Sequence, residues 1–269
     1  MNVDLKGKTA LVTGSTDGIG KQTALELARM RARVLLHGKD AVKGRRVLEE
    51  IRNASGNEDL DLFIADLAAL GQVRRMSEAV RRKCDRLDVL INNAGIAAKD
   101  RRWSEDGFEM TFAVNYLAGF LLTLELLDLI RKSAPSRIIM VSSMVHSSNV
   151  NWKNPSGGKS FDGWEAYCQS KLCDILFAYE LAEKLKGSGV TVNCLHPGVI
   201  NTKLLRVNFS GGQPVAEGSK TAVYLATSLE LENVTGKYFV DRRETKSAAV
   251  TYDPEIRRKL WQLSEELCR

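Results

Sequence analysis

Apolar positions along the chain alternate between short runs rich in β-branched residues and longer segments whose apolar residues recur at helical spacing. The short runs predict strands over Thr9–Thr13, Arg33–His37, Leu60–Ala65, Leu87–Ile91, Arg137–Ser142, Val190–Leu195 and Gly236–Val240. The longer segments predict helices over Gly18–Met30, Ala41–Ala54, Leu70–Lys83, Gly107–Arg131, Glu165–Lys186 and Ala216–Leu229. Such alternation is typical of βαβ units, in which the strands run parallel.

The predicted strands carry few polar residues, as expected where helices cover both faces of a sheet. Because βαβ crossovers are right-handed, we expect the units to assemble into a doubly wound sheet. No Pro/Gly-rich linker and no internal repeat divides the 269 residues. We therefore predict a single α/β domain over residues 1–269, a Rossmann-type parallel sheet of about seven strands with helices on both faces.

Two segments lack periodicity and are rich in Gly, Ser, Asn and Pro, namely Ser147–Gly163 and Arg206–Pro214. Loops of this kind often carry binding function on a rigid scaffold, so we expect substrate loops at about residues 147–163 and 201–216. A solvent-exposed excursion without function is the alternative. Trp152 and Trp164 either line an apolar substrate wall or pack the loop, and Phe209 is a candidate for a closing lid.

The charge pattern limits the possible partners. The net charge is +6, but the basic pairs are spread along the chain and form no recognition module, so we expect no nucleic-acid binding. The five cysteines lack metal-type spacing, which predicts reduced thiols and no metal site. The start, MNVDLKGK, has no apolar signal core, and the most apolar stretch, Gly119–Ile130, is short for a membrane span and contains Glu125 and Asp128. We expect a soluble cytoplasmic protein without a transmembrane segment.

A glycine-rich segment follows the first predicted strand and opens directly into a helix. It runs Gly14, Ser15, Thr16, Asp17, Gly18, Ile19, Gly20. Glycines at these positions permit a tight turn and close approach of a pyrophosphate, while the helix N-terminus supplies amide donors. We interpret the segment as a dinucleotide cradle, with a simple glycine turn as the alternative reading.

The end of the second strand bears on the choice of cofactor. A carboxylate there would bind the 2′-hydroxyl of NAD, and a basic residue would bind the 2′-phosphate of NADP. Lys39 therefore favours NADP(H) over NAD, while Asp40 is better interpreted as the cap of the next helix. Asp66 ends the third strand, followed by Leu67, and either accepts from the adenine amino group or caps a helix.

Tyr167 and Lys171 share one face of a predicted helix at i, i+4 spacing. A phenol ordinarily ionises near pH ~10, and a close ammonium favours the phenolate. We therefore expect Lys171 to lower the pKa of Tyr167 toward the range useful for proton transfer. Ser143 ends the fifth strand at the carboxyl edge, where doubly wound sheets bind ligands, and could hold a substrate oxygen beside the phenol.

These residues resemble the short-chain dehydrogenases/reductases over essentially the whole chain. Thr13–Gly20 is similar to the family motif TGxxxGIG, and Asn92–Gly95 reproduces its NNAG motif, which adds Asn93, Ala94 and Gly95 to the cofactor residues. The motif PG matches Pro197 and Gly198, with Ile200 and Thr202 beyond it as nicotinamide contacts. The resemblance also assigns the catalytic residues Asn115, Ser143, Tyr167 and Lys171.

The resemblance implies one task for each catalytic residue. Ser143 would orient the substrate oxygen, Tyr167 would transfer the proton, Lys171 would bind the nicotinamide ribose, and Asn115 would position a relay water. The expected reaction is hydride transfer between NADP(H) and a small-molecule carbonyl/alcohol substrate, which family similarity suggests is apolar. VSSMVH, AYCQSK and LHPGV resemble the retinol-dehydrogenase-like branch, in which arginine is more common at the place of Lys39. His146 could contact substrate, or more simply bond loop backbone.

Two other functions use the same residues. The site could reduce a carbon–carbon double bond, as the related protochlorophyllide branch does, or the chain could be a non-catalytic NADP(H) sensor. A sensor usually loses the tyrosine or the lysine, and this chain keeps both. Members of the family commonly dimerise through the helices that carry Asn115 and Tyr167, so a homodimer is also expected.

Overall fold

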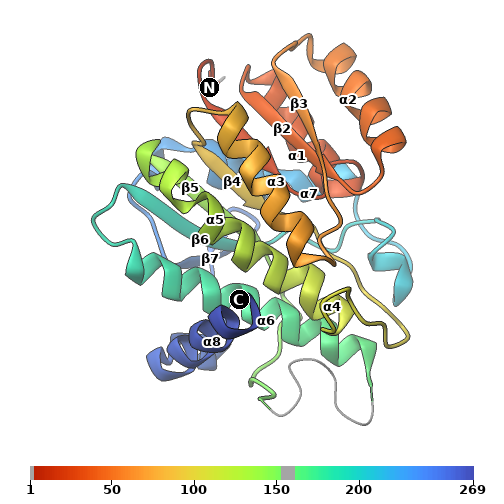
Figure 1. Cartoon of the computed structure of the whole chain (residues 1–269), viewed down its shortest axis with the longest axis vertical. Coiled ribbons are helices and arrows are strands. Elements are labelled where there is room, and N and C mark those ends of the chain that lie inside the picture. Colours follow the sequence, from red (N-terminus) through yellow and green to blue (C-terminus); the bar gives the residue numbers. More distant parts are fainter. Residues whose placement is uncertain (1–2, 153–160) are drawn as a thin grey trace.

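The described residues form one eight-stranded sheet in the order β3-β2-β1-β4-β5-β6-β7-β8 (Figure 1). A computed structural model describes residues 3–152 and 161–269. The strands are β1 (Thr9–Val12), β2 (Arg33–Gly38), β3 (Leu60–Ile64), β4 (Val89–Asn92), β5 (Ser136–Val141), β6 (Val190–His196), β7 (Lys237–Val240) and β8 (Arg243–Glu244). The first seven pair in parallel, and β8 pairs antiparallel with β7. The strand order reverses between β1 and β4, where doubly wound sheets bind ligands.

Helices cover both faces of this sheet and enclose two apolar layers. They are α1 (Gly18–Arg29), α2 (Ala41–Ser55), α3 (Leu70–Lys83), α4 (Met110–Phe112), α5 (Ala118–Lys132), α6 (Gly163–Lys184), α7 (Val215–Thr227) and α8 (Pro254–Leu267). One layer lies between the sheet and α1, α2 and α7, and the other between the sheet and α3, α5 and α6. The predicted doubly wound α/β fold is confirmed.

The predicted count of about seven strands is one short. β8 is a two-residue strand joined to β7 by Asp241 and Arg242, both with positive φ, 53° and 64°. A two-residue turn of this kind suits the right-handed twist of a hairpin. Because β8 is short, polar and exposed, no apolar alternation marks it in the sequence.

Helix α8 is absent from the helices that the periodicity predicted. It begins with Asp253, whose side chain accepts from the N–H groups of Glu255 and Ile256, and it has Pro254 in its first turn. Figure 1 shows α8 lying beside α6, on the side of the molecule remote from α2. Its Trp261 ring lies 5.2 Å from that of Phe120 and 5.8 Å from that of Phe177, between ring centroids.

The helix predicted over Gly107–Arg131 begins instead at Met110, after the side chain of Glu109 accepts from the N–H groups of Thr111 and Phe112. A π-turn at Ala113–Leu117 then interrupts it before α5. The whole run Met110–Lys132 is long and apolar enough to cross a membrane by length and composition, so the shortness of Gly119–Ile130 was a wrong argument against a span. However, 72% of its most apolar window is buried inside the fold, as in a central core helix.

Candidate active site

The glycine loop between β1 and α1 has a shape that side chains could not adopt. Gly14 and Gly18 have φ of +64° and +49°, the left-handed region that favours glycine. A Cβ on Gly20 would lie 2.4 Å from Asn93 Nδ2 and 2.5 Å from the Gly14 carbonyl oxygen. The loop therefore packs directly on the segment after β4, and its amide groups stay at the N-terminus of α1.

Thr13 joins these two segments. Its hydroxyl accepts the N–H groups of Asn93 at 2.9 Å and Ala94 at 3.0 Å, and the Asn93 amide donates to the Thr13 carbonyl at 2.8 Å. The predicted glycine loop and the segment Asn93–Gly95 consequently lie side by side at the point where the strand order reverses.

His37 supports the same loop from the end of β2. The Gly14 N–H donates to its Nδ1 at 3.0 Å, so the ring proton is on Nε2, which lies 3.1 Å from the Ala65 carbonyl. Burial lowers the pKa of His37 to about 4, which keeps the ring neutral at pH 7. Ser15 adds a further link, because its hydroxyl accepts the His37 N–H at 2.9 Å.

The residues expected at the adenosine end also meet. Lys39 Nζ lies 3.8 Å from Asp66 Oδ2, across the ends of β2 and β3. Asp40 caps α2, as predicted, by accepting from the N–H groups of Val42 and Lys43. Asp66 instead accepts the Ala68 N–H at 3.0 Å, and the first N–H of α3 bonds to Asp106. The helix-cap interpretation of Asp66 is therefore wrong.

Asp17 places a carboxylate within the glycine loop. It caps α1 through the Gly18 N–H and forms ion pairs with Lys43 at 2.6 Å and Lys203 at 3.0 Å. Burial opposes its charge, but these bonds outweigh burial and lower the pKa of Asp17 to about 2. The two lysines therefore offset an acid that would otherwise repel a pyrophosphate.

The segment after β6 closes the cradle on its other side. Gly198 has φ of +95°, and Pro197 precedes it. A Cβ on Gly18 would lie 3.4 Å from Thr202 Cγ2. A Cβ on Gly218 of α7 would lie 2.8 Å from both Ile19 and Ile200. The predicted nicotinamide segment thus contacts the glycine loop, although about 180 residues separate the two in sequence.

Tyr167 and Lys171 project from one face of α6, and both are buried. Lys171 Nζ lies 5.9 Å from the centroid of the Tyr167 ring and donates to the Val141 carbonyl at 2.7 Å. The Ser142 hydroxyl donates to the Lys171 carbonyl at 2.7 Å, which fixes the end of β5 against α6. Ser143 follows directly and is also buried, so it lies at this edge of the sheet.

Asn115 lies in the π-turn, buried beside Lys171. Its Oδ1 accepts the Ile96 N–H at 2.8 Å, and its Nδ2 donates to the Ile96 carbonyl and the Ser170 hydroxyl, both at 3.0 Å. A Cβ on Gly95 would lie 3.6 Å from Asn115 Oδ1 and 3.7 Å from Lys171 Nζ. Both N–H donors of the side chain are therefore used within the protein, and the residue sits in a π-turn, where the main-chain hydrogen-bond register shifts.

The aromatic side chains of the two predicted substrate loops lie in two different places. The Trp164 ring lies 6.0 Å from that of Tyr167 and 5.3 Å from that of Phe209. Trp152 instead packs beneath Lys259 of α8, whose Nζ lies 4.3 Å from its ring centroid. Trp164 thus borders the site, whereas Trp152 packs the loop. The part of this loop at residues 153–160 lies outside the described residues.

A cavity of about 490 Å³ lies between these loop residues and the first turns of α6. Its lining includes His146, Trp164 and Cys168. His146 Nδ1 lies 2.6 Å from the Ser143 carbonyl, and its Nε2 accepts the Ala248 N–H at 3.0 Å. The interpretation of His146 as a backbone-bonding residue is confirmed.

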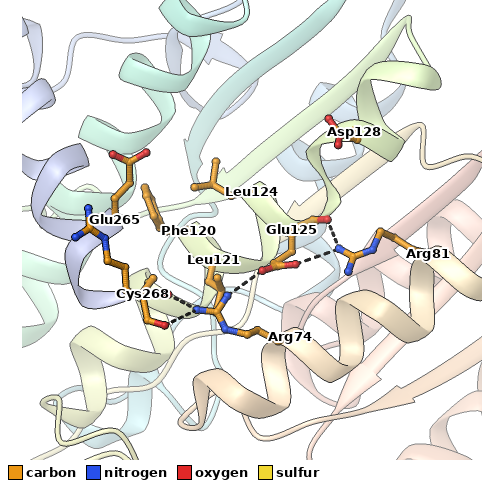
Figure 2. A pocket seen from close by; sticks show the side chains of 10 residues that line it. Arg74, Arg81, Phe120, Leu121, Leu124, Glu125, Asp128, Glu265 and Cys268 are labelled. Carbon is orange, nitrogen blue, oxygen red and sulfur yellow. Dashed lines mark hydrogen bonds and ion pairs between the residues drawn. The ribbon is translucent and has the colours of Figure 1, made fainter.

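A larger cavity, of about 650 Å³, lies away from these residues between α3, α5 and the C-terminus (Figure 2). Arg74 and Arg81 both bond to Glu125 across it, at 2.9 and 3.1 Å. None of the predicted catalytic or cofactor residues lines this cavity. Arg74 and Arg81 in its walls are already paired with Glu125. We therefore place the chemistry at the carboxyl edge of the sheet, where the predicted residues lie.

The residues at the sheet edge fit a dinucleotide. Gly14 and Gly20 pack against Ala94 and Asn93 with no room for a Cβ, the loop opens into the N-terminus of α1, and Lys39 directly follows β2. Sequence reasoning missed Thr13 and His37 as supports of this cradle, and Asp174, which bonds Lys171. Asp174 lies three residues beyond Lys171 on the same helical face, a spacing that the sequence displays.

Comparison with known proteins gives the family. The sequence model of the short chain dehydrogenase family matches residues 8–211. The chain is a short-chain dehydrogenase. It is 42% identical to retinol dehydrogenase 13 of Mus musculus, over 98% of this chain and 84% of that protein. It is 39% identical to retinol dehydrogenase 14 of Homo sapiens, over 97% and 86% of the two chains. This short-chain dehydrogenase therefore belongs to the retinol-dehydrogenase-like branch.

Solved structures agree with this assignment. An uncharacterised protein from Mycobacterium Paratuberculosis superposes with a TM-score of 0.84 at 28% identity, over 99% of this chain and 95% of its own. A short chain dehydrogenase from Escherichia coli CFT073, complexed with NADPH, superposes with a TM-score of 0.75 at 26% identity, over 90% and 100%. The short-chain dehydrogenase described here is thus an NAD(P)-dependent alcohol/carbonyl oxidoreductase.

Proposed function

We propose that this short-chain dehydrogenase transfers hydride between NADP(H) and an apolar carbonyl/alcohol substrate, with Tyr167 as the proton-transfer residue. One observation carries the proposal. The Lys171 ammonium lies 5.9 Å from the Tyr167 ring at the carboxyl edge of the sheet, beside the glycine cradle. This arrangement brings a buried cation beside the phenol that would exchange a proton with the substrate oxygen.

The chain's own residues divide the work of binding. The Gly14–Gly20 loop and the α1 N-terminus would hold the pyrophosphate, while Lys39 would pair with the 2′-phosphate. Asp66 and Leu67 would hold the adenine, and the segments 93–95 and 197–202 would hold the nicotinamide. Bound NADP(H) would supply or accept the hydride.

The catalytic residues orient substrate and move its proton. Ser143 would donate a hydrogen bond to the substrate oxygen and hold it near the Tyr167 hydroxyl. Tyr167 would give that oxygen a proton during reduction and remove one during oxidation. Lys171 would bind the ribose through its remaining N–H, and Asn115 would position the relay water.

The rim of the site supports an apolar substrate. Met144 and Val199, which adjoin Ser143 and Gly198, are more than half exposed, as is Phe209. Trp164 extends this apolar surface beside Tyr167. Exposed apolar side chains gathered at a site suit a hydrophobic ligand. Similarity to retinol dehydrogenases makes retinal one member of the class to be tested.

Location and assembly are further parts of the proposal. The five cysteines are free, which suits a reducing compartment such as the cytoplasm. For the expected homodimer we propose a contact through α5, since α8 already packs on α6 within the chain.

A cofactor and substrate screen tests the function. NADPH oxidation is followed with apolar aldehydes and ketones, including retinal, and repeated with NADH and with a charged carbonyl such as pyruvate. We expect turnover of apolar carbonyls with NADPH and little with pyruvate. A preference for NADH, or for pyruvate, would overturn the assignment of Lys39 or of the apolar rim.

A further inference from the structure

Asp174 lies where a carboxylate is costly. It sits on α6 with 1% of its surface exposed, and an unpaired charge in such a place is strongly unfavourable. Its Oδ2 accepts a bond from Lys171 Nζ at 3.0 Å, while Oδ1 has no hydrogen-bond partner among the described residues. The partner that compensates this burial is therefore Lys171.

The same pair fixes the direction of the Lys171 ammonium. An ammonium has three N–H donors. Asp174 accepts one and the Val141 carbonyl accepts another at 2.7 Å, so one donor remains for the side of Tyr167 and the ribose. Tyr167, Lys171 and Asp174 follow i, i+4, i+7 spacing along one face of α6.

We propose that Asp174 is a positioning residue that fixes the Lys171 ammonium and offsets its charge, and thereby sets the pH range in which Tyr167 exchanges its proton. The inference rests on the proposed function and deepens it. An ammonium that is paired with a carboxylate stabilises a neighbouring phenolate less than an unpaired ammonium does.

The other titratable groups around Asp174 are uncharged, so the local charge depends on Lys171 and Asp174. Cys173 on α6, Cys194 on β6 and Tyr116 in the π-turn face it, and burial raises the pKa of each of them, so they stay neutral. Tyr116 also bonds the Ser264 hydroxyl of α8 at 2.6 Å. Lys171 is thus the cation that contacts Asp174 among the residues described.

The charge state of Asp174 changes within an accessible pH range. Burial raises the pKa of Asp174 to about 6, although Lys171 opposes the increase. Burial also disfavours the charged form of Lys171, but Asp174 and Tyr167 outweigh it and raise the pKa of the ammonium. Above about pH 6 the pair is therefore balanced, and below that pH the ammonium stands alone.

The test removes the charge and keeps the shape. Asp174→Asn is isosteric and can still accept from Lys171, and Asp174→Leu removes the same charge if the amide variant does not fold. Glu183→Gln is the matched control, because it removes an exposed acid from the same helix. Two quantities are measured against pH: kcat/KM for alcohol oxidation, and the tyrosinate absorbance of unliganded protein minus that of the Tyr167→Phe form.

We expect the acid limb of kcat/KM and the Tyr167 tyrosinate transition to move to lower pH by about one unit in the Asp174 variants. Glu183→Gln should leave both unchanged. Unchanged curves in a folded Asp174 variant, or a movement to higher pH, would overturn the inference. If the wild-type protein turns over no carbonyl or alcohol, the proposed function fails, while the tyrosinate transition still decides the role of Asp174.

Discussion

Single residues at the sheet edge owe their properties to what surrounds them. Lys39 is three-quarters exposed, and its weak ion pair with Asp66 spans 3.8 Å. A bound 2′-phosphate would offer this ammonium a more highly charged partner than Asp66, so Lys39 should discriminate between the two nicotinamide cofactors.

Replacing Lys39 with alanine should weaken NADPH binding by about tenfold, the scale of one partly exposed charge-assisted bond, and change NADH binding by less than about twofold. Fluorescence titration with both cofactors measures this. Lys237→Ala, which removes a lysine at the amino end of β7, is the control and should affect neither cofactor. An equal loss of affinity for NADPH and NADH would contradict the role of Lys39.

At this scale the sequence revealed the residues that belong to motifs and missed their supports. Tyr167, Lys171 and the glycines were predicted, because their spacing carries the signal. His37 was missed as a support of the cradle because its bond to the Gly14 N–H joins residues 23 positions apart. A contact between residues so far apart in the chain produces no pattern in the local sequence.

At the level of helices and strands, α8 packs against α6. Trp261 lies between Phe120 of α5 and Phe177 of α6, and the Lys184 ammonium lies 4.6 Å from its ring centroid. The Tyr116 hydroxyl bonds Ser264 at 2.6 Å, which ties α8 to the π-turn that carries Asn115. The docking of α8 therefore supports the helices of the catalytic residues.

Trp261→Ala should lower the free energy of unfolding by about 3 kcal/mol, because it leaves a cavity beside the rings of Phe120 and Phe177. Urea denaturation of the two proteins measures the difference. Trp103→Ala is the control, since Trp103 is half exposed, and it should cost less than about 1 kcal/mol. A loss below 1 kcal/mol for Trp261→Ala would mean that α8 docks by other contacts.

Periodicity predicted the seven parallel strands and most helices because their apolar faces are long and buried. It missed β8, which has two exposed residues, and the π-turn, which lies in a run buried on most sides, so that no polar face marks the change of register. Both features arise from backbone hydrogen bonding, which side-chain patterning does not encode.

Across the whole molecule, the site is assembled from segments that only the fold brings together. The loops after β1, β4, β5 and β6 end at one edge of the sheet, and Thr13 and Gly218 are the points where they pack. The sequence predicted this convergence, because each motif follows a predicted parallel strand and parallel strands place their carboxyl ends at one edge of the sheet. Substrate choice was less predictable, since it depends on loop side chains such as Trp164 and Phe209 that meet only in three dimensions.

Proton transfer by the Tyr167 phenol beside the Lys171 ammonium is tested most directly by comparing two variants of α6. These are Tyr167→Phe and Tyr179→Phe, the second at a tyrosine further along the helix that bonds Ser247 at 3.0 Å. We predict that Tyr167→Phe binds NADPH within about twofold of the wild-type affinity and turns over at least ~100-fold more slowly, while Tyr179→Phe keeps its turnover. Turnover near the wild-type rate in Tyr167→Phe would contradict the account.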